Sequence, residues 1–311
     1  MKRAPAPLPA FSAASVDIVM PHQQKYRELT KILKECGKIA VAFSGGVDSS
    51  LLLYAAVAAV GGENVTAATI HAPFHSTYEI AAAKTLAAGF NCRHLLIKED
   101  ELLRDAAFCA NPPDRCYLCK KVIFGKLREA LQAPKYVAAG GSGANDLQGS
   151  CPAEEAPAEI VVVDGSNADD LKDYRPGMRA VRELNVASPL QQAGLTKKEI
   201  RLLAREFGLA TWDRPSAPCL CSRIPYGSAI TEKKLRQVES GEELLRRLGF
   251  PEARLRHHEN LARIEIPADL IKDFTDEHVL AKVRHQLREL GFQYVTLDLH
   301  GFRSGSLNEV L

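Results

Sequence analysis

A short apolar segment followed at once by a serine- and glycine-rich loop constrains the fold of this chain more than any other feature. Residues 38–43 predict a buried strand, and residues 49–60 predict a helix. Between them lies Ser44-Gly45-Gly46-Val47-Asp48-Ser49-Ser50. The glycines let the backbone approach an anion, and the new helix directs its free N–H groups and positive dipole end to the same place. This strand–loop–helix unit predicts a pyrophosphate cradle.

The loop lacks the Gly-Lys-Ser/Thr ending of a Walker loop, so γ-phosphate transfer is not indicated. It resembles the signature of the PP-loop (N-type ATP pyrophosphatase) superfamily, which activates an acyl or amide oxygen as an adenylate with release of pyrophosphate. The resemblance implies that ATP is bound by Ser44, Gly45, Gly46, Asp48, Ser49 and Ser50, with Asp48 helping to hold Mg²⁺. The structural alternative is a Gly-Gly turn capped by Ser44 or Asp48.

Strands and helices alternate through the first two thirds of the chain, which predicts a parallel sheet covered on both faces. Further strands are expected at 65–71, 93–97, 136–139 and 160–163, and helices at 23–36, 77–88, 120–131 and 196–207. Residues 140–157 are expected to be a surface insertion. After the linker 215–218 come a helix at 231–248, a strand at 262–266, one or two helices up to 290 and a strand at 294–299.

The predicted fold class is therefore α/β, a Rossmann-like parallel-sheet PP-loop domain followed by a smaller α+β domain. We expect a flexible lead-in at 1–20, the PP-loop domain at 21–214, and a substrate-binding and catalytic domain at 215–311.

Charge and hydropathy exclude several classes of protein. The formal net charge of +2 gives no sign of a nucleic-acid or membrane-surface partner. The longest apolar stretch, 51–60, is too short to span a bilayer, and the first 19 residues lack the apolar core of a secretory signal. We expect a cytoplasmic protein, in which the eight cysteines form no disulfide framework.

Three cysteines stand out by position. Cys116 and Cys119 have the CxxC spacing that can grip one metal or cluster, and the neighbouring cations Arg115, Lys120 and Lys121 are expected to lower the pKa of both thiols. Cys219 lies in the linker, with Cys221 two residues on. Metal ligation or sulfur chemistry is the favoured interpretation, and a chance or redox pair is the alternative. Outside this group, Cys36 and Cys92 are expected to be inert core thiols, and Cys109 and Cys151 are undecided.

Several further stretches resemble the LarE family, ATP-dependent sulfur transferases that build the nickel-pincer cofactor of lactate racemase. They are residues 111–121, 164–170, 173–177, 218–227 and 297–303. The resemblance runs from about residue 23 to the C-terminus, interrupted at 140–157. It implies that ATP adenylylates each carboxylate of pyridinium-3,5-biscarboxylic acid mononucleotide, which is then converted to a thiocarboxylate.

The resemblance also implies a role for the cysteines. Some members sacrifice the sulfur of a cysteine at the Cys219 position, whereas others hold a [4Fe–4S] cluster on three cysteines that match Cys116, Cys119 and Cys219. Because this chain has all three, we expect the cluster type, whose unligated iron can carry sulfide from a donor. Sacrifice of the Cys219 sulfur itself stays open. Cys221, at i+2 in a linker expected to be extended, is predicted to point the other way, and a role as an alternate ligand is the alternative.

Binding residues follow from the same resemblance. Nucleotide binding is expected at Asp164, Asn167 and Asp170, for which a turn and a helix cap are the alternative. The substrate phosphate and carboxylates are expected to meet residues of the second domain, where a solvated surface is the alternative; the candidates are Ser222, Arg223, Glu242, Arg254, Arg256 and Asp273. The family also tends to form closed homo-oligomers.

Three other functions compete with this one. A PP-loop tRNA thiolase needs a large basic surface, which a net charge of +2 does not favour. An ammonia-using, amide-forming synthetase gives no reason for the three cysteines. A non-catalytic Fe–S or zinc protein would use nucleotide only as a structural ligand, and would release no pyrophosphate on addition of substrate.

Overall fold

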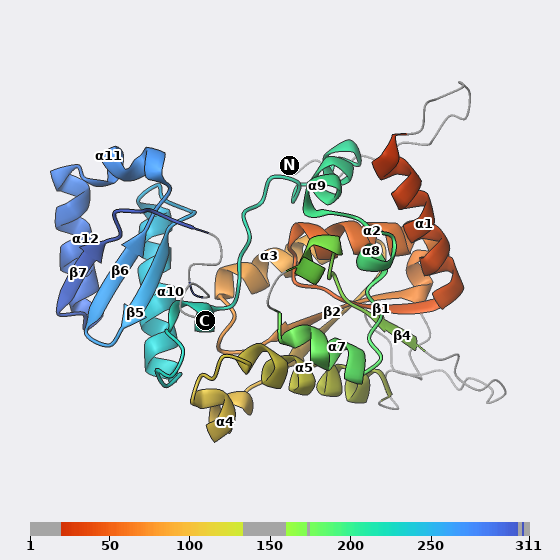
Figure 1. Ribbon diagram of the computed structural model, residues 1–311, viewed down its shortest axis with the longest axis horizontal. Helices are drawn as coiled ribbons and strands as arrows, with labels where there is room; N and C mark the ends of the chain where they lie inside the picture. The colour runs from red at the N-terminus through yellow and green to blue at the C-terminus, as the bar shows by residue number, and fades with distance from the viewer. Residues whose placement is uncertain (1–19, 133–159, 173–174, 304–306, 308–311) are drawn as a thin grey trace, which may run out of the picture.

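The computed structural model describes residues 20–132, 160–172, 175–303 and 307. Figure 1 shows two layered units joined by the linker that follows α9. The expected strand at 136–139, the insertion at 140–157 and the first 19 residues lie outside the described residues.

A four-stranded parallel sheet organises the first unit, in the order β3-β2-β1-β4. Its strands are β1 (Lys38–Ala42), β2 (Val65–His71), β3 (Arg93–Lys98) and β4 (Ile160–Val163). The alternation of strands and helices along the chain predicts this arrangement, and the expected α/β, Rossmann-like fold class is confirmed.

Helices cover both faces of this sheet (Figure 1). On one side lie α1 (Pro21–Cys36), α2 (Val47–Val60), α3 (Thr77–Ala87), α8 (Pro189–Gln192) and α9 (Lys197–Glu206), and on the other α5 (Arg115–Gln132) and α7 (Gly177–Glu183). Successive β1 side chains alternate between the two layers, as the period of a strand requires. Ile39 and Val41 pack with α1 and α2, whereas Ala40 packs with Phe124 and Leu127 of α5.

The second unit is a three-stranded mixed sheet packed on helices. It contains β5 (Arg254–His258), β6 (Leu261–Glu265) and β7 (Tyr294–Leu297), with α10 (Glu232–Arg247), α11 (Ile271–Phe274) and α12 (Glu277–Glu289). The order is β5-β6-β7, with β5 antiparallel and β7 parallel to β6. The sequence predicted β6 and β7 but missed β5, whose five residues include four arginines and histidines.

The hydrophobic core of the second unit extends into the first. Phe74, Leu102 and Phe108, the last from α4 (Ala106–Cys109), join the same buried cluster as residues of α10, β5 and β6. The backbone N–H of Leu220 donates to the carbonyl of Phe74 at 2.9 Å. The division of the chain at residue 215 into two domains stays a prediction.

Local signals at two helix starts had different outcomes. Thr196 caps α9 in a full capping box with Glu199, as its sequence spacing predicts. The helix expected from residue 120 begins instead at Arg115, so the CxxC motif occupies the first turns of α5 rather than a loop.

In the described part of the chain, no helix combines the length and apolar character needed to cross a bilayer.

Candidate active site

The predicted pyrophosphate cradle lies where β1 ends and α2 begins. Gly45 has a φ of +74°, and a Cβ there would lie 3.1 Å from Ala83 of α3, so glycine is required. The hydroxyl oxygens of Ser44 and Ser49 lie 3.2 Å apart, and Ser49 donates to the carbonyl of Gly46 at 3.1 Å. The first N–H groups of α2 have no acceptor within the helix, so the loop presents donors suited to phosphate oxygens.

Asp48, on the first turn of α2, meets two residues from far along the chain. Asn167 Nδ2 donates to Asp48 Oδ1 at 3.2 Å, and Lys197 Nζ pairs with Asp48 Oδ2. The backbone of Gly165 packs against the same turn, because a Cβ there would lie 3.2 Å from the nitrogen of Ser49. The segment after β4 therefore borders the cradle, where the sequence expected nucleotide contacts. Asp48 offers the hard oxygen ligands that Mg²⁺ prefers, and Lys197 would compete with the ion for one of them.

Asp164 connects the cradle to α5. It is buried and accepts hydrogen bonds from the hydroxyls of Ser166 and Ser188, each at 2.7 Å. Its third side-chain partner is Lys120 Nζ at 3.2 Å. Lys120 directly follows Cys119, so this ion pair joins the edge of the nucleotide loop to the cysteine motif.

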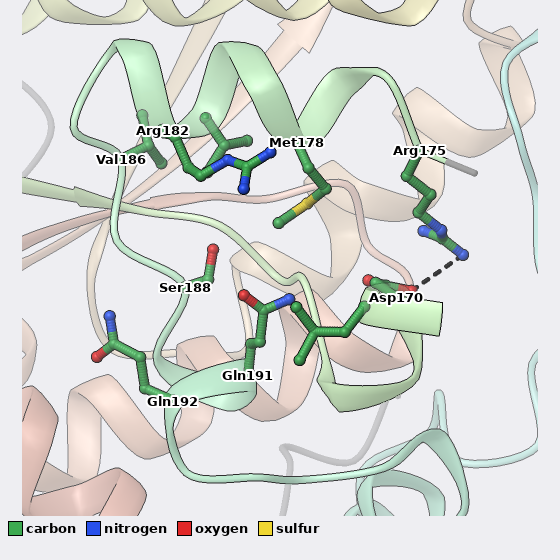
Figure 2. Close-up of a pocket in the computed structure, with 10 residues that line it drawn as sticks. Asp170, Arg175, Met178, Arg182, Val186, Ser188, Gln191 and Gln192 are labelled. Atoms are coloured by element: carbon green, nitrogen blue, oxygen red, sulfur yellow. Dashed lines mark ion pairs between the residues drawn. The ribbon is translucent and has the colours of Figure 1, made fainter. Parts of the chain in front are cut away.

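Asp170 faces a different space. Its Oδ2 accepts the backbone N–H of Asn167 at 3.0 Å, and its Oδ1 pairs with Arg175 at 3.0 Å. Figure 2 shows this ion pair at the edge of a cavity of about 320 Å³. The rest of its lining is Leu171, Met178, Val181, Arg182, Val186, Ser188, Gln191 and Gln192. None of the described cysteines is among these residues.

Four cysteines line a second, smaller cavity of about 120 Å³, here named the cysteine cavity. Cys116 and Cys119 come from α5, whereas Cys219 and Cys221 come from the linker and the short 3₁₀ helix Leu220–Arg223. The remaining lining is Phe74, Phe108, Arg115 and Lys120. The expectation that Cys221 points the other way is wrong, because the chain turns as a 3₁₀ helix here and is not extended.

The donor set of the cysteine cavity fits a thiolate-bound cluster. Within the described ranges, no three histidine, cysteine, aspartate or glutamate side chains are arranged to hold a single metal ion. The cysteines of a [4Fe–4S] cluster bind separate irons, so a cluster does not require convergence on one point. Arg115 and Lys120 also line the cavity and offset the negative charge that such thiolates carry.

The surroundings favour the thiolate of Cys219 in particular. A hydrogen bond with Cys221, together with the charges of Arg115, His75 and Arg223, holds the pKa of Cys219 well below its usual value even though burial opposes the charge. The same hydrogen bond and burial raise the pKa of Cys221 well above its usual value. Burial and the charge of Cys219 raise the pKa of Cys116 and Cys119, so the expectation that neighbouring cations lower the pKa of both thiols is wrong. Since the thiolate is the nucleophilic and metal-binding form of cysteine, the surroundings favour this form at Cys219 over the other three thiols.

Arg115 ties the start of α5 to the linker. It is 3% exposed, and its Nη1 donates to the carbonyl of Cys221 at 3.2 Å and to Asn111 Oδ1. Asn111 in turn donates to the carbonyls of Ile224 and Pro225 at 3.2 and 2.8 Å. These bonds hold the two cysteine-bearing segments together.

Arg223 and Glu242 form a buried bidentate ion pair behind Cys219. Nε and Nη2 of Arg223 donate to the two carboxylate oxygens of Glu242 at 2.8 and 3.0 Å. Nη1 donates to the carbonyls of Pro218 and Cys219 at 2.7 and 3.3 Å. The pair therefore fixes the backbone that carries Cys219.

The other expected substrate residues differ in exposure. Arg254 and Arg256 are 6% and 8% exposed, so neither is a solvated surface charge. Arg256 pairs with Glu265 at 2.7 Å and donates to the carbonyl of Ser222 at 2.9 Å. Arg254 donates to the carbonyl of Ser216 in the linker at 2.8 Å. Asp273, by contrast, is exposed on α11.

Sequence reasoning missed several residues that border these sites. Lys197 and Arg214 contact the nucleotide loop, and His75 acts on Cys219. Arg115 and Lys120 were not missed, because they flank the CxxC motif in the sequence, and both line the cysteine cavity. The others reach the site only through tertiary folding.

Comparisons with known proteins find a family match around the nucleotide loop and relatives along most of the chain. Residues 30–116 match the asparagine synthase family, whose region includes the nucleotide loop. The pyridinium-3,5-bisthiocarboxylic acid mononucleotide synthase of Lactiplantibacillus plantarum is 37% identical over 289 residues, covering 92% of this chain and 95% of the relative. An uncharacterized Synechocystis protein is 37% identical over 93% of this chain and 98% of its own length. An uncharacterized Methanocaldococcus jannaschii protein is 32% identical over 86% and 91%.

The identity to the Lactiplantibacillus plantarum relative extends over nearly the full length of both chains, so it includes the cysteine-bearing segments and the second unit as well as the nucleotide loop. The chain belongs to the LarE family of ATP-dependent PP-loop sulfur transferases.

Proposed function

We propose that this enzyme adenylylates the carboxylates of pyridinium-3,5-biscarboxylic acid mononucleotide and converts them to thiocarboxylates for nickel-pincer cofactor biosynthesis. The name of the Lactiplantibacillus plantarum relative supports the substrate class. The observation that carries the proposal is the cysteine cavity itself, which gathers four thiols. Its Lys120 pairs with Asp164, and the next residue, Gly165, packs against the nucleotide loop.

The chain's own residues divide the work between two places. The N–H groups of the Ser44–Ser50 loop hold the pyrophosphate of ATP, and Asp48 helps to bind Mg²⁺. Asp164 and Asn167 shape the border of this loop. We assign substrate phosphate and carboxylate binding to the region of Ser222, Arg254 and Arg256, where guanidinium groups lie beside the linker.

Sulfur transfer is assigned to Cys116, Cys119 and Cys219. A [4Fe–4S] cluster on these thiolates would supply an iron that carries sulfide from an external donor. Arg115 and Lys120 stabilise the anionic sulfur, and the rings of Phe74 and Phe108 limit the access of water to it. Arg223 keeps the Cys219 backbone fixed while the activated carboxylate approaches.

The test is anaerobic purification with iron and acid-labile sulfide analysis, followed by turnover with ATP, sulfide and the dicarboxylate. We expect a thiocarboxylate product, pyrophosphate release that depends on the substrate, and more than one sulfur delivered per chain with Cys219 intact by mass. Cys219→Ala abolishes sulfur transfer, whereas Cys36→Ser, a control in α1 where the thiol bonds the Ile32 carbonyl, retains it.

Three outcomes contradict parts of the proposal. A single turnover that leaves the chain lighter by one H₂S shows sacrifice of the Cys219 sulfur and overturns the cluster mechanism. An amide product from ammonia, or a salt-sensitive complex with tRNA that becomes thiolated, overturns the substrate assignment.

A further inference from the structure

Arg214 joins the linker to the nucleotide loop. It stands one residue before the linker that leads to Cys219. Its Nη1 donates to the carbonyl of Gly45 at 3.0 Å, and its Nη2 pairs with Glu79 of α3 at 2.6 Å. The Arg214 side chain is 17% exposed, so these bonds are largely shielded from water.

The backbone around Arg214 is also held in place. Arg201 of α9 donates from Nη1 to the carbonyl of Trp212 at 2.7 Å and from Nη2 to the carbonyl of Arg214 at 2.8 Å. A helix of the first unit therefore fixes the Arg214 backbone, and the ion pair with Glu79 holds the guanidinium fork beside the loop.

The bond to the Gly45 carbonyl determines where the next N–H group points. In a trans peptide the C=O of Gly45 and the N–H of Gly46 point in opposite directions. A carbonyl drawn toward Arg214 therefore turns the Gly46 N–H away from Arg214. That N–H donates to Ser44 Oγ, with 3.4 Å between nitrogen and oxygen, and so points to the cradle side of the loop.

Glycine on both sides of this peptide makes its orientation easy to reverse. Neither Gly45 nor Gly46 has a Cβ to restrict φ and ψ, so a flip of the peptide meets little steric resistance. The flipped peptide would direct a carbonyl oxygen, rather than an N–H donor, toward the phosphates of ATP. The Arg214 bond opposes that flip.

We propose that Arg214 is a positioning residue for ATP binding, which holds the Gly45–Gly46 peptide with its N–H toward the pyrophosphate and anchors the Cys219 linker to the same loop. Glu79 keeps the guanidinium in place and balances its charge. The effect is confined to the phosphates, since Arg214 acts on the loop peptide and not on the nucleoside.

The experiment compares dissociation constants of Mg-ATP, Mg-pyrophosphate and adenosine by titration calorimetry with the full chain. Arg214→Gln removes the charged fork and is expected to weaken ATP and pyrophosphate about tenfold, the equivalent of roughly 1.4 kcal/mol, and adenosine less than about twofold. Arg214→Lys keeps the charge but not the fork, and we expect a loss of about threefold. The matched control is Arg236→Gln, which breaks an exposed ion pair with Glu232 on α10 and leaves all three constants unchanged.

The selectivity between ligands separates positioning from general stability. Equal weakening of adenosine and ATP by Arg214→Gln, or no weakening of ATP, overturns the role of Arg214. Neither result touches the sulfur-transfer proposal, which depends on the cysteine cavity. Failure of the wild-type chain to bind ATP would instead contradict the nucleotide site itself.

Discussion

The buried ion pair between Arg223 and Glu242 makes the sharpest prediction for stability. The two side chains are only 4% and 10% exposed, and Glu242 also accepts the backbone N–H of Leu255 at 3.1 Å. Glu242→Ala leaves the Arg223 guanidinium buried without a counter-charge. Removal of one partner from a buried pair costs about 3–5 kcal/mol, so we expect a loss of that size in the free energy of unfolding.

Urea unfolding followed by circular dichroism measures this loss. The control is Glu232→Ala on the same helix, because Glu232 and Arg236 are 62% and 66% exposed and their pair contributes less than about 1 kcal/mol. The double variant Arg223→Met with Glu242→Leu removes both charges, and we expect it to recover most of the stability lost in Glu242→Ala. Equal losses in Glu242→Ala and Glu232→Ala would refute the reasoning.

The same double variant separates folding from function. Its second unit is expected to fold, yet the carbonyls of Pro218 and Cys219 lose the donor that fixes them. We therefore expect sulfur transfer to fall at least about tenfold while pyrophosphate release changes less, since a misplaced reacting group costs far more than its local contact energy. Full sulfur transfer in the stable double variant would show that Arg223 does not position Cys219.

Further predictions concern the nucleotide loop, one helix cap and two glycines. Asp48→Asn removes a hard oxygen ligand, so we expect the Mg²⁺ concentration needed for pyrophosphate release to rise at least about tenfold. Burial alone raises the pKa of Glu199, but hydrogen bonds from Lys25 and Thr196 outweigh it and hold that pKa below its usual value. The stability that ionised Glu199 contributes is therefore present above the unfolded-state pKa of about 4.3, and it is lost as pH falls through the lower folded-state pKa. Glu199→Gln should lower the free energy of unfolding by about 1 kcal/mol at pH 7 and by progressively less in acid. Thermal unfolding at several pH values measures this difference. The new Cβ of Gly125→Ala in α5 meets open space, so we expect the free energy of unfolding to rise by about 0.5–1 kcal/mol. Gly241→Ala would place its Cβ against the Leu255 side chain, so we expect a fall of about 1–3 kcal/mol in the same assay.

The parallel sheet and its nucleotide loop were predictable because their signals are local. Residues 39–43 are an apolar run of strand length, two glycines follow after Ser44, and the next residues have helix-forming composition. The capping box at Thr196 and Glu199 is equally local, since both partners lie within one helical turn. These features need no knowledge of the rest of the chain.

Strand β5 and the position of Cys221 were not predictable in this way. From sequence, Arg254 and Arg256 are candidates for substrate binding, with a solvated surface as the alternative, and their charge hides the strand that carries them. Glu265 on β6 and carbonyls of the linker satisfy both guanidinium groups in the interior. The turn that brings Cys221 onto the cysteine cavity is braced by Arg223 and Arg115, which bond the carbonyls of Cys219 and Cys221. Strand β5 and the turn at Cys221 both depend on partners that are distant in sequence, so no local pattern of apolar residues predicts them.

The distribution of charge around the cysteine cavity explains how a chain of near-neutral net charge can handle anionic sulfur. Arg115 and Arg223 are almost fully buried near Cys219, and Lys120 lies between the cavity and Asp164. Buried cations act through a lower effective dielectric than surface charges, so they stabilise a thiolate more strongly than the formal charge of the whole chain suggests. In the proposed reaction the same cations attract the carboxylates of the substrate, which become electrophilic only after adenylylation. The cations that stabilise the thiolate lie at the cysteine cavity, whereas the N–H donors for the phosphates of ATP lie at the cradle. Sulfur transfer and adenylylation therefore use separate groups, and Lys120 lies between the two places.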